Sequence, residues 1–307
     1  MNKASKIYIA GHRGMVGSAV WRALEQLGYT NLIGRTSTEL DLRNQEAVAQ
    51  FFKKEQPEIV VDAAARVGGI LANQKDQYGF LMENMRIQNN LIQESVTQGV
   101  DKFIFLGSSC IYPKMAPQPL KEEYLLTGPL EPTNEGYAIA KISGVKLCQA
   151  LREQKGKYFV SLMPTNLYGP NDNFDLESSH VMPAMMRKFH EAKINGNTPV
   201  KLWGSGTPLR EFLHVDDMAK AVVFALENEL PGHLYNVGTG VDLSIKELAL
   251  LIQKIVGHEG ELLWDADKPD GTPRKLMDVS QLKSLGWEAT IPLEEGIRKT
   301  YDWFRKN

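Results

Sequence analysis

The sequence predicts an α/β protein built on a doubly wound parallel sheet, with a smaller mixed α/β domain beside it. In the first half of the chain, short apolar runs rich in branched residues alternate with longer helical patterns, as in parallel sheets covered on both faces. A glycine-rich turn follows the first of these runs. Beyond about Leu167 the alternation stops, and Pro, Asn and Gly cluster at Tyr168–Phe174, which indicates a second unit.

The elements of the larger unit follow from periodicity and from glycine or proline stop signals. Strands are expected at Lys6–Ala10, Asn31–Gly34, Ile59–Ala63, Lys102–Leu106 and Tyr158–Met163, and helices at Gly14–Leu27, Gln45–Glu55, Phe80–Gly99 and Tyr137–Gln154. Right-handed crossovers between parallel strands of this kind produce a Rossmann-type sheet.

The second half of the chain predicts the remaining elements and the domain limits. Helices are expected at Val181–Ala192, Asp216–Glu227, Ser244–Val256 and Leu293–Phe304, and strands at Pro199–Trp203, His233–Val237 and Glu261–Trp264. The helix at Asp216–Glu227 and the strand after it are expected to return to the large sheet. The Rossmann domain is therefore predicted as residues 1–167 plus 213–241, and a substrate-binding domain as residues 168–212 plus 242–307.

Composition narrows the classes of function. The 307 residues carry 35 basic and 37 acidic side chains, so bulk charge gives no support for a nucleic-acid partner. No apolar run approaches the roughly 18 residues that a membrane span needs, and the first five residues lead straight into a strand pattern without a signal peptide. Only Cys110 and Cys148 are cysteines, which favours a reducing compartment. We expect a cytoplasmic protein with neither a nucleic-acid nor a membrane partner.

The glycine-rich turn predicts dinucleotide binding. Glycines after a first strand allow a tight turn and close approach of the backbone to a pyrophosphate, and the helix amino terminus adds unpaired N–H groups. A loop that merely needs positive φ angles is the alternative. The expected cofactor-binding residues of this turn are Gly11, His12, Arg13, Gly14, Met15, Val16 and Gly17.

The end of the second strand indicates which dinucleotide binds. NAD sites usually carry an acid there, whereas this chain has Arg35 and no acid, with Arg13 nearby in the glycine turn. Guanidinium groups bind phosphate well, so NADP(H) is predicted. The alternative is that Arg35 is simply solvated.

A catalytic set follows from spacing. Ser108 comes after the fourth strand, and Tyr137 and Lys141 lie one helical turn apart on one face. An ammonium near a phenol favours the phenolate, which allows proton exchange with a carbonyl or alcohol. Ser108 can donate a hydrogen bond to the same oxygen.

These motifs resemble the extended short-chain dehydrogenase/reductase family, and the match extends over nearly the whole chain. The residues that carry it are GHRGMVG at Gly11–Gly17, AAARVGGI at Ala63–Ile70, LGSSCIYP at Leu106–Pro113, EPTNEGYAIAK at Glu131–Lys141, MPTNLYGP at Met163–Pro170, WGSGTPLREFLHVDD at Trp203–Asp217 and KPDGTPRK at Lys268–Lys275.

The resemblance implies a two-step, NADPH-dependent conversion of GDP-4-keto-6-deoxy-D-mannose to GDP-L-fucose. Carbons 3 and 5 are epimerised first, and the ketone at carbon 4 is then reduced. Cys110 matches the base that removes the protons, and His180 matches the acid; from the residues alone Cys110 is more typical of a small apolar filler, and His180 of a capping or surface histidine. The implied catalytic residues are Ser108, Cys110, Tyr137, Lys141 and His180.

The resemblance also implies binding residues. The cofactor is expected to contact Arg35, Asp41, Leu42, Ala64, Leu106, Gly107, Tyr137, Lys141, Pro164, Asn166, Leu167 and His180 as well as the glycine turn. The GDP-sugar is expected to contact Ser108, Ser109, Cys110, Asn166, Lys188, Trp203, Arg210, Asp270 and Lys275, for several of which a core or solvated side chain is the alternative. No metal is expected. Ser37 departs from the family pattern, in which some relatives have arginine.

Three further points remain open from sequence. The resemblance implies a homodimer formed through Phe80–Gly99 and Gly136–Gln154, although a monomer fits the sequence too. A reductase or epimerase acting on another GDP-keto-sugar, such as a GDP-heptose, is the nearest alternative, and a reductase alone would need neither Cys110 nor His180. A non-catalytic cofactor sensor is a further alternative, but the intact Ser108, Tyr137 and Lys141 set argues against it.

Overall fold

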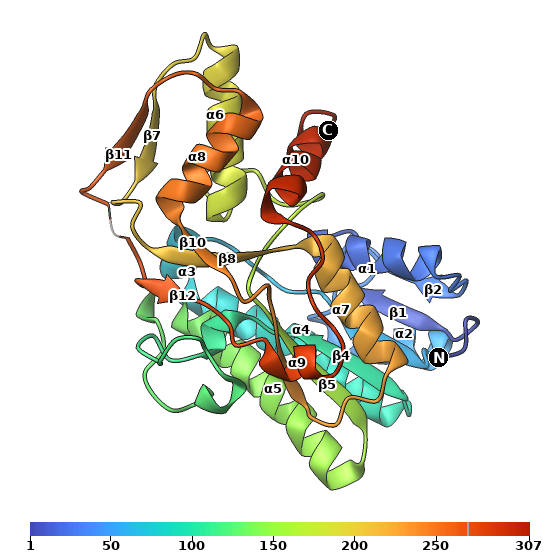
Figure 1. Cartoon of the computed structure of the whole chain (residues 1–307). Coiled ribbons are helices and arrows are strands. Elements are labelled where there is room, and N and C mark those ends of the chain that lie inside the picture. Colours follow the sequence, from blue (N-terminus) through green and yellow to red (C-terminus); the bar gives the residue numbers. More distant parts are fainter. Residues whose placement is uncertain (269) are drawn as a thin grey trace.

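A computed structural model describes residues 1–268 and 270–307, so Pro269 of the KPDGTPRK string lies outside it. The larger unit contains a six-stranded sheet in the order β2-β1-β3-β4-β5-β9 (Figure 1). All neighbouring strands are parallel, which confirms the predicted doubly wound α/β fold. The strands are β1 (Ile7–Ala10), β2 (Leu32–Ile33), β3 (Ile59–Asp62), β4 (Lys102–Leu106), β5 (Tyr158–Pro164) and β9 (Leu234–Val237).

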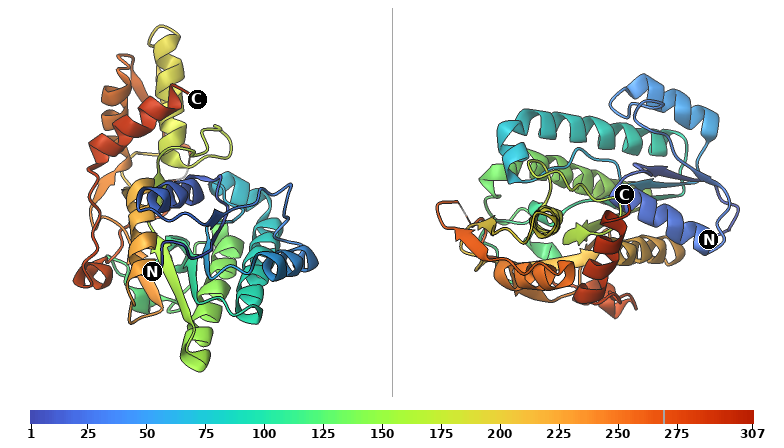
Figure 2. Two further views of the ribbon diagram at one scale, coloured as in Figure 1. Left: turned by 90° about the vertical axis from the view of Figure 1, so that its right-hand side faces the viewer. Right: turned by 90° about the horizontal axis from the view of Figure 1, so that it is seen from above.

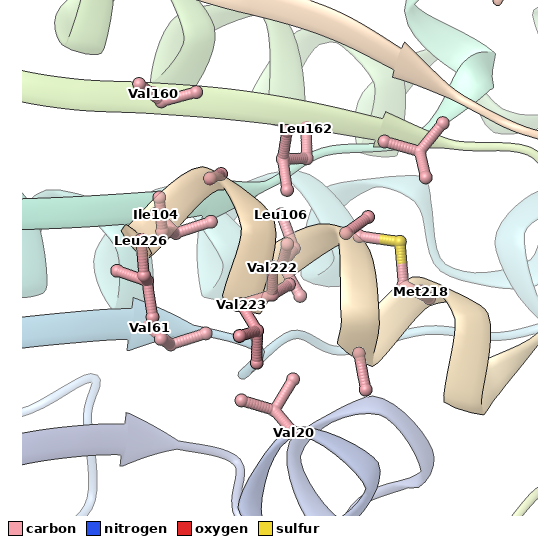
Figure 3. Close-up of a cluster of buried hydrophobic side chains, with 14 of the residues drawn as sticks. Val20, Val61, Ile104, Leu106, Val160, Leu162, Met218, Val222, Val223 and Leu226 are labelled. Atoms are coloured by element: carbon pink, nitrogen blue, oxygen red, sulfur yellow. The ribbon is translucent and has the colours of Figure 1, made fainter. Parts of the chain in front are cut away.

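Helices cover both faces of this sheet, because its strands present apolar side chains alternately to each side. On one face lie α1 (Met15–Gln26) and α7 (Val215–Glu227), and Figure 3 shows Val20 and Val222 of these helices packed near Val61 and Ile104 of the strands. On the other face lie α2 (Gln45–Glu55), α4 (Gln77–Thr97) and α5 (Glu135–Lys155).

The smaller unit is mixed α/β, as predicted, and lies beyond one end of the large sheet (Figures 1 and 2). Strand β8 pairs in parallel with β6 and β12 and antiparallel with β10, and β7 pairs in parallel with β11. The elements are β6 (Asn166–Tyr168), α6 (Val181–Ile194), β7 (Val200–Trp203), β8 (Leu209–His214), β10 (Asp242–Ser244), α8 (Ile245–Val256), β11 (Leu262–Asp265), β12 (Arg274–Lys275) and α10 (Leu293–Phe304). Its core is formed mainly by α6, α8 and α10.

Several short elements were not predicted. They are α3 (Ile70–Lys75), β6, β8, β10, β12, α9 (Ser280–Ser284) and the 3-10 turns η1 (Ser109–Ile111), η2 (Glu122–Tyr124) and η3 (Pro132–Asn134). Strand β8 escaped prediction because Glu211 interrupts its apolar pattern. Glu211 is nevertheless fully buried, and its side chain accepts hydrogen bonds from the backbone N–H groups of Thr239, Gly240 and Met277.

The domain limits at residues 1–167 plus 213–241 and 168–212 plus 242–307 remain a prediction. Leu282 and Trp287, which are in the second of the segments assigned to the substrate domain, pack in the core between the large sheet, α1 and α7. In the part of the chain that the structure describes, no helix is both long enough and apolar enough to span a bilayer.

Candidate active site

A cavity of about 790 Å³ opens at the carboxyl ends of β1, β3, β4 and β5, where ligands bind in open α/β sheets. Residues of the smaller unit complete its wall. The structure thus brings together most of the predicted catalytic and binding residues, namely Gly14, Met15, Val16, Leu106, Gly107, Ser108, Ser109, Cys110, Tyr137, Lys141, Pro164, Asn166, Leu167, His180, Arg210, Asp270 and Lys275.

Other predicted residues do not line this cavity. They are Gly11, His12, Arg13, Gly17, Arg35, Asp41, Leu42, Ala64, Lys188 and Trp203. Asp41 is paired with Arg43 at 2.9 Å, and Leu42 packs against the core under α2 and α4. The binding roles of these residues remain predictions.

The cavity wall also contains residues to which the sequence analysis assigned no catalytic or binding role. They are Ala63, Ala65, Val67, Gly68, Gly69, Ile70, Asn73, Gln74, Lys114, Glu131, Thr133, Asn134, Thr165, Gly271 and Thr272. Two signals were present: most of these residues lie in the strings that carry the family resemblance, and the segment after β3 begins at the carboxyl end of a strand, the edge at which sites form. The others come from loops whose course depends on tertiary packing.

The glycine turn has the close packing that a dinucleotide site requires. Gly11 has φ +76°, a conformation that favours glycine, and a Cβ on Gly17 would lie 2.2 Å from the Gly11 carbonyl oxygen. Gly14 caps the amino end of α1, whose first N–H groups are free to bind a ligand. This backbone cradle fits the pyrophosphate of a dinucleotide.

The two arginines predicted to select NADP(H) are in different environments. Arg35 donates to Glu55 Oε1 and to the Gly34 carbonyl oxygen, both at 2.8 Å, so its charge is largely offset. Arg13 is exposed in the glycine turn. The neighbouring His12 packs on Gly34, where a Cβ would lie 2.4 Å from the imidazole ring. Arg13 is therefore the cation better placed to meet an added phosphate.

Helix α5 carries Tyr137 and Lys141 into the cavity. Lys141 is buried, its Nζ donates to the Leu106 carbonyl oxygen at 2.8 Å, and the same atom lies 5.9 Å from the centre of the Tyr137 ring. Burial raises the pKa of Tyr137 and lowers the pKa of Lys141. The expectation that the ammonium would favour the phenolate is thus not met in the free protein, because desolvation dominates. The phenol keeps its proton and can act as an acid.

Ser108 and Cys110 follow β4 in a tight turn. Ser108 caps η1, and the Cys110 backbone N–H donates to Ser108 Oγ at 3.4 Å. Cys110 is 5% exposed, and burial raises the pKa of its thiol although the nearby Lys275 ammonium opposes the rise. Cys148, by contrast, is fully buried in the core under α5.

His180 precedes α6 and lines the cavity from the smaller unit. The residue is exposed at the cavity, and desolvation of its imidazole lowers its pKa. The free protein therefore holds a neutral imidazole and a neutral thiol at neutral pH.

Two cations on paired strands form the polar side of the cavity. Arg210 on β8 and Lys275 on β12 are register partners, so their side chains share one face of this small sheet. Asp270 accepts hydrogen bonds from the Ser205 backbone N–H at 2.7 Å and from its hydroxyl at 2.8 Å. Paired cations of this kind suit a diphosphate.

Trp203 lies outside the cavity lining but beside two further cations. Its ring is half exposed, and the Lys188 and Lys268 ammonium groups lie 5.9 and 5.5 Å from the centre of the ring. An exposed aromatic face of this kind offers a stacking surface for a planar group.

Comparisons with known proteins agree with this geometry. The family model described as "NAD dependent epimerase/dehydratase family" matches residues 7–238. The chain is 56% identical over 306 residues to "GDP-L-fucose synthase 1" of Arabidopsis thaliana, covering 100% of this chain and 95% of the relative. It is 54% identical over 312 residues to "GDP-L-fucose synthase" of Escherichia coli (strain K12), covering 98% and 97%.

A solved structure shows the same fold. The GDP-mannoheptose C4 reductase of Campylobacter jejuni, determined with NADP bound, superimposes with a TM-score of 0.91 at 41% identity and 99% coverage of both chains. Family model, full-length relatives and fold all agree with the resemblance seen in the sequence. The chain belongs to the NAD dependent epimerase/dehydratase family, part of the extended short-chain dehydrogenases/reductases.

Proposed function

We propose that this protein is a GDP-L-fucose synthase, which converts GDP-4-keto-6-deoxy-D-mannose to GDP-L-fucose with NADPH. The observation that carries the proposal is the cavity in which a thiol and an imidazole meet the serine, tyrosine and lysine of a reductase. Reduction alone needs only the last three. The identity of 54% to 56% over full length to two GDP-L-fucose synthases supports the same substrate.

The first stage inverts carbons 3 and 5. Hydrogens beside the carbon 4 ketone are acidic, and Ser108 and Tyr137 hold the ketone oxygen as negative charge develops on it. At each of the two carbons the Cys110 thiolate removes one proton and the protonated His180 returns one to the opposite face. Between the two inversions the Cys110 thiol releases its proton to solvent and His180 takes one up, which restores the pair. Lys275 lies close enough to favour the thiolate.

The second stage reduces the ketone. When bound, NADPH supplies the hydride that adds to carbon 4. Tyr137 gives its phenolic proton to the carbonyl oxygen, which suits a phenol whose pKa burial has raised. Lys141 holds the nicotinamide ribose beside the tyrosine, while Ser108 keeps the oxygen in place.

The cofactor assignment rests on the glycine cradle and on Arg13. The cradle fits either dinucleotide, whereas the exposed guanidinium of Arg13 suits the 2′-phosphate of NADP(H). The NADP bound to the Campylobacter jejuni reductase supports this choice.

Product identification tests the proposed function against a reductase for another GDP-keto-sugar. The protein is incubated with GDP-4-keto-6-deoxy-D-mannose and NADPH in heavy water, and the product is analysed by NMR. We expect GDP-L-fucose with deuterium at carbons 3 and 5. Reduction without deuterium at these carbons would leave a reductase alone, and turnover only with a GDP-heptose would reassign the substrate.

The proposed assembly is a homodimer through α4 and α5. Tyr78 on α4 and Ile139 and Leu147 on α5 expose large apolar surfaces that a partner would cover. Light scattering on the whole protein is expected to give twice the mass of one chain, and the double variant Ile139→Lys, Leu147→Lys to give the single mass. A monomeric wild-type protein would refute this assembly.

A further inference from the structure

Asp62 is a buried acid to which the proposed reaction gives no role. It ends strand β3 and has no exposed surface. Its Oδ1 accepts a hydrogen bond from the Ala64 backbone N–H at 3.2 Å, whereas Oδ2 is buried and, within the described residues, has no hydrogen-bond partner. Burying a carboxyl oxygen without a partner costs stability, so this position needs a physical reason.

Strand pairing places Asp62 on the face of the sheet that α5 covers. Its register partners are Ala10 on β1 and Phe105 on β4, and residues paired across strands present their side chains to one face. Ala10 and Phe105 both pack in the core with α5. The Lys141 ammonium of α5 lies 4.8 Å from the centre of the Phe105 ring. The carboxyl and the ammonium therefore occupy the same buried region.

The two groups act on each other through space, because Lys141 directs its 2.8 Å hydrogen bond to the Leu106 carbonyl oxygen. Burial raises the pKa of Asp62 to about 6, and the Lys141 charge opposes that rise. Burial lowers the pKa of Lys141, and the Asp62 charge opposes that fall. At neutral pH, Asp62 is mostly ionised and stabilises the ammonium.

The other titratable groups near this pair are neutral at that pH. These groups are Tyr8 on β1, Cys110 on η1, and Tyr137 and Cys148 on α5, and burial raises the pKa of each. The neighbouring helix α4 presents the uncharged Gln88 to the Ala140 carbonyl oxygen of α5. Asp62 thus supplies the negative charge that balances Lys141.

We propose that Asp62 is a positioning residue of the active site, whose buried carboxylate keeps Lys141 charged so that it can hold the nicotinamide ribose and support Tyr137. The role of Lys141 in this inference rests on the proposed function. The charge interaction between Asp62 and Lys141 does not depend on which sugar is reduced, so the inference can be tested on cofactor binding alone.

NADPH affinity is measured on the whole protein by fluorescence titration from neutral to alkaline pH. In the wild type, affinity should fall as Lys141 loses its proton. In Asp62→Asn this fall should begin about one pH unit lower, the size of effect that one neighbouring charge produces. Asp62→Glu, which restores the charge, should recover the wild-type profile. Asp62→Ser serves as the second neutral variant in case the asparagine variant does not fold.

Asp172→Asn is the matched control. Asp172 is another acid with a buried Oδ2 that has no partner among the described residues, and desolvation raises its pKa to about 7, but it does not act on Lys141. Its variant should keep the wild-type profile. An unshifted profile in a folded neutral variant of Asp62, or an equal shift in Asp172→Asn, would overturn the inference. A protein that fails to reduce the keto-sugar but shows the shift would instead count against the proposed function.

Discussion

Replacing Cys110 with serine is expected to separate the two stages of the reaction. The substitution exchanges a thiol that is 5% exposed for a hydroxyl of similar size and leaves Tyr137 and Lys141 unchanged. A serine hydroxyl does not ionise at accessible pH, so the variant has no base to remove the protons at carbons 3 and 5. Reduction, which needs no thiolate, should continue.

The structure sets the scale of this effect. Burial raises the pKa of Cys110 above its ordinary 9.0, and desolvation lowers the pKa of His180 below its ordinary 6.5. Both shifts favour the neutral forms, so thiolate and imidazolium coexist in only a small fraction of the free protein. The wild-type rate rests on this small fraction. Loss of a general base typically costs about 10²- to 10⁴-fold, or roughly 3 to 5 kcal/mol.

The same values predict the pH dependence of proton exchange. As pH rises between the two pKa values, the thiolate fraction grows tenfold per unit, while the imidazolium fraction falls tenfold. Their product stays constant, so exchange at carbons 3 and 5 should be independent of pH from about 6.5 to 9. A steep rise over this interval would show that His180 is not the acid.

Deuterium incorporation at carbons 3 and 5 is followed by NMR, and NADPH oxidation by absorbance, on the same samples. Cys148→Ser is the matched control, since it removes a thiol that is buried in the core away from the cavity. It should exchange at the wild-type rate. Wild-type exchange in Cys110→Ser would refute the assignment of the base.

Three further substitutions test the cofactor side. Tyr137→Phe should bind NADPH normally but lose about 10²- to 10⁴-fold in reduction, measured as kcat; unchanged kcat would exclude the phenol as proton donor. Arg13→Ser should lose its preference for NADPH over NADH, whereas Arg35→Ser should keep more of that preference, because Arg35 is paired with Glu55. Both variants are titrated with both cofactors. A larger loss of preference in Arg35→Ser than in Arg13→Ser would contradict the assignment. Gly17→Ala should weaken binding of both cofactors and lower the melting temperature, since its Cβ would meet the Gly11 carbonyl oxygen at 2.2 Å and force the turn open at a cost of about 1–3 kcal/mol.

Much of the fold could be predicted from the local sequence pattern. Helices α2 and α10 and strand β4 have the predicted bounds, because apolar periodicity and stop signals are properties of neighbouring residues. Strand β8 could not be found in this way. In the sequence, Glu211 is typical of an exposed position. Only the tertiary structure shows that it is buried and accepts hydrogen bonds from backbone N–H groups distant in sequence.

The candidate site also combines features that the local sequence predicts with features that depend on tertiary packing. Tyr137 and Lys141 lie together because four residues make one helical turn, and Gly11–Gly17 form a cradle within a single turn of chain. Other features depend on partners distant in sequence. Strand pairing places Lys275 beside Arg210, and the fold directs Arg35 to Glu55. Neither contact has a signal in the local sequence.

Sequence alone predicted the fold class, the glycine-rich turn and the shared helix face of Tyr137 and Lys141, because short-range sterics and hydrophobic spacing fix strands, helices and turns. Tertiary structure decided which of these residues meet and in which charge state. Burial keeps the proton on Tyr137 despite the nearby Lys141. The pairing of β3 with β1 and β4 places Asp62 on the face of the sheet that α5 covers. Desolvation and long-range charge arise only when distant segments pack together, so they are set by the folded chain.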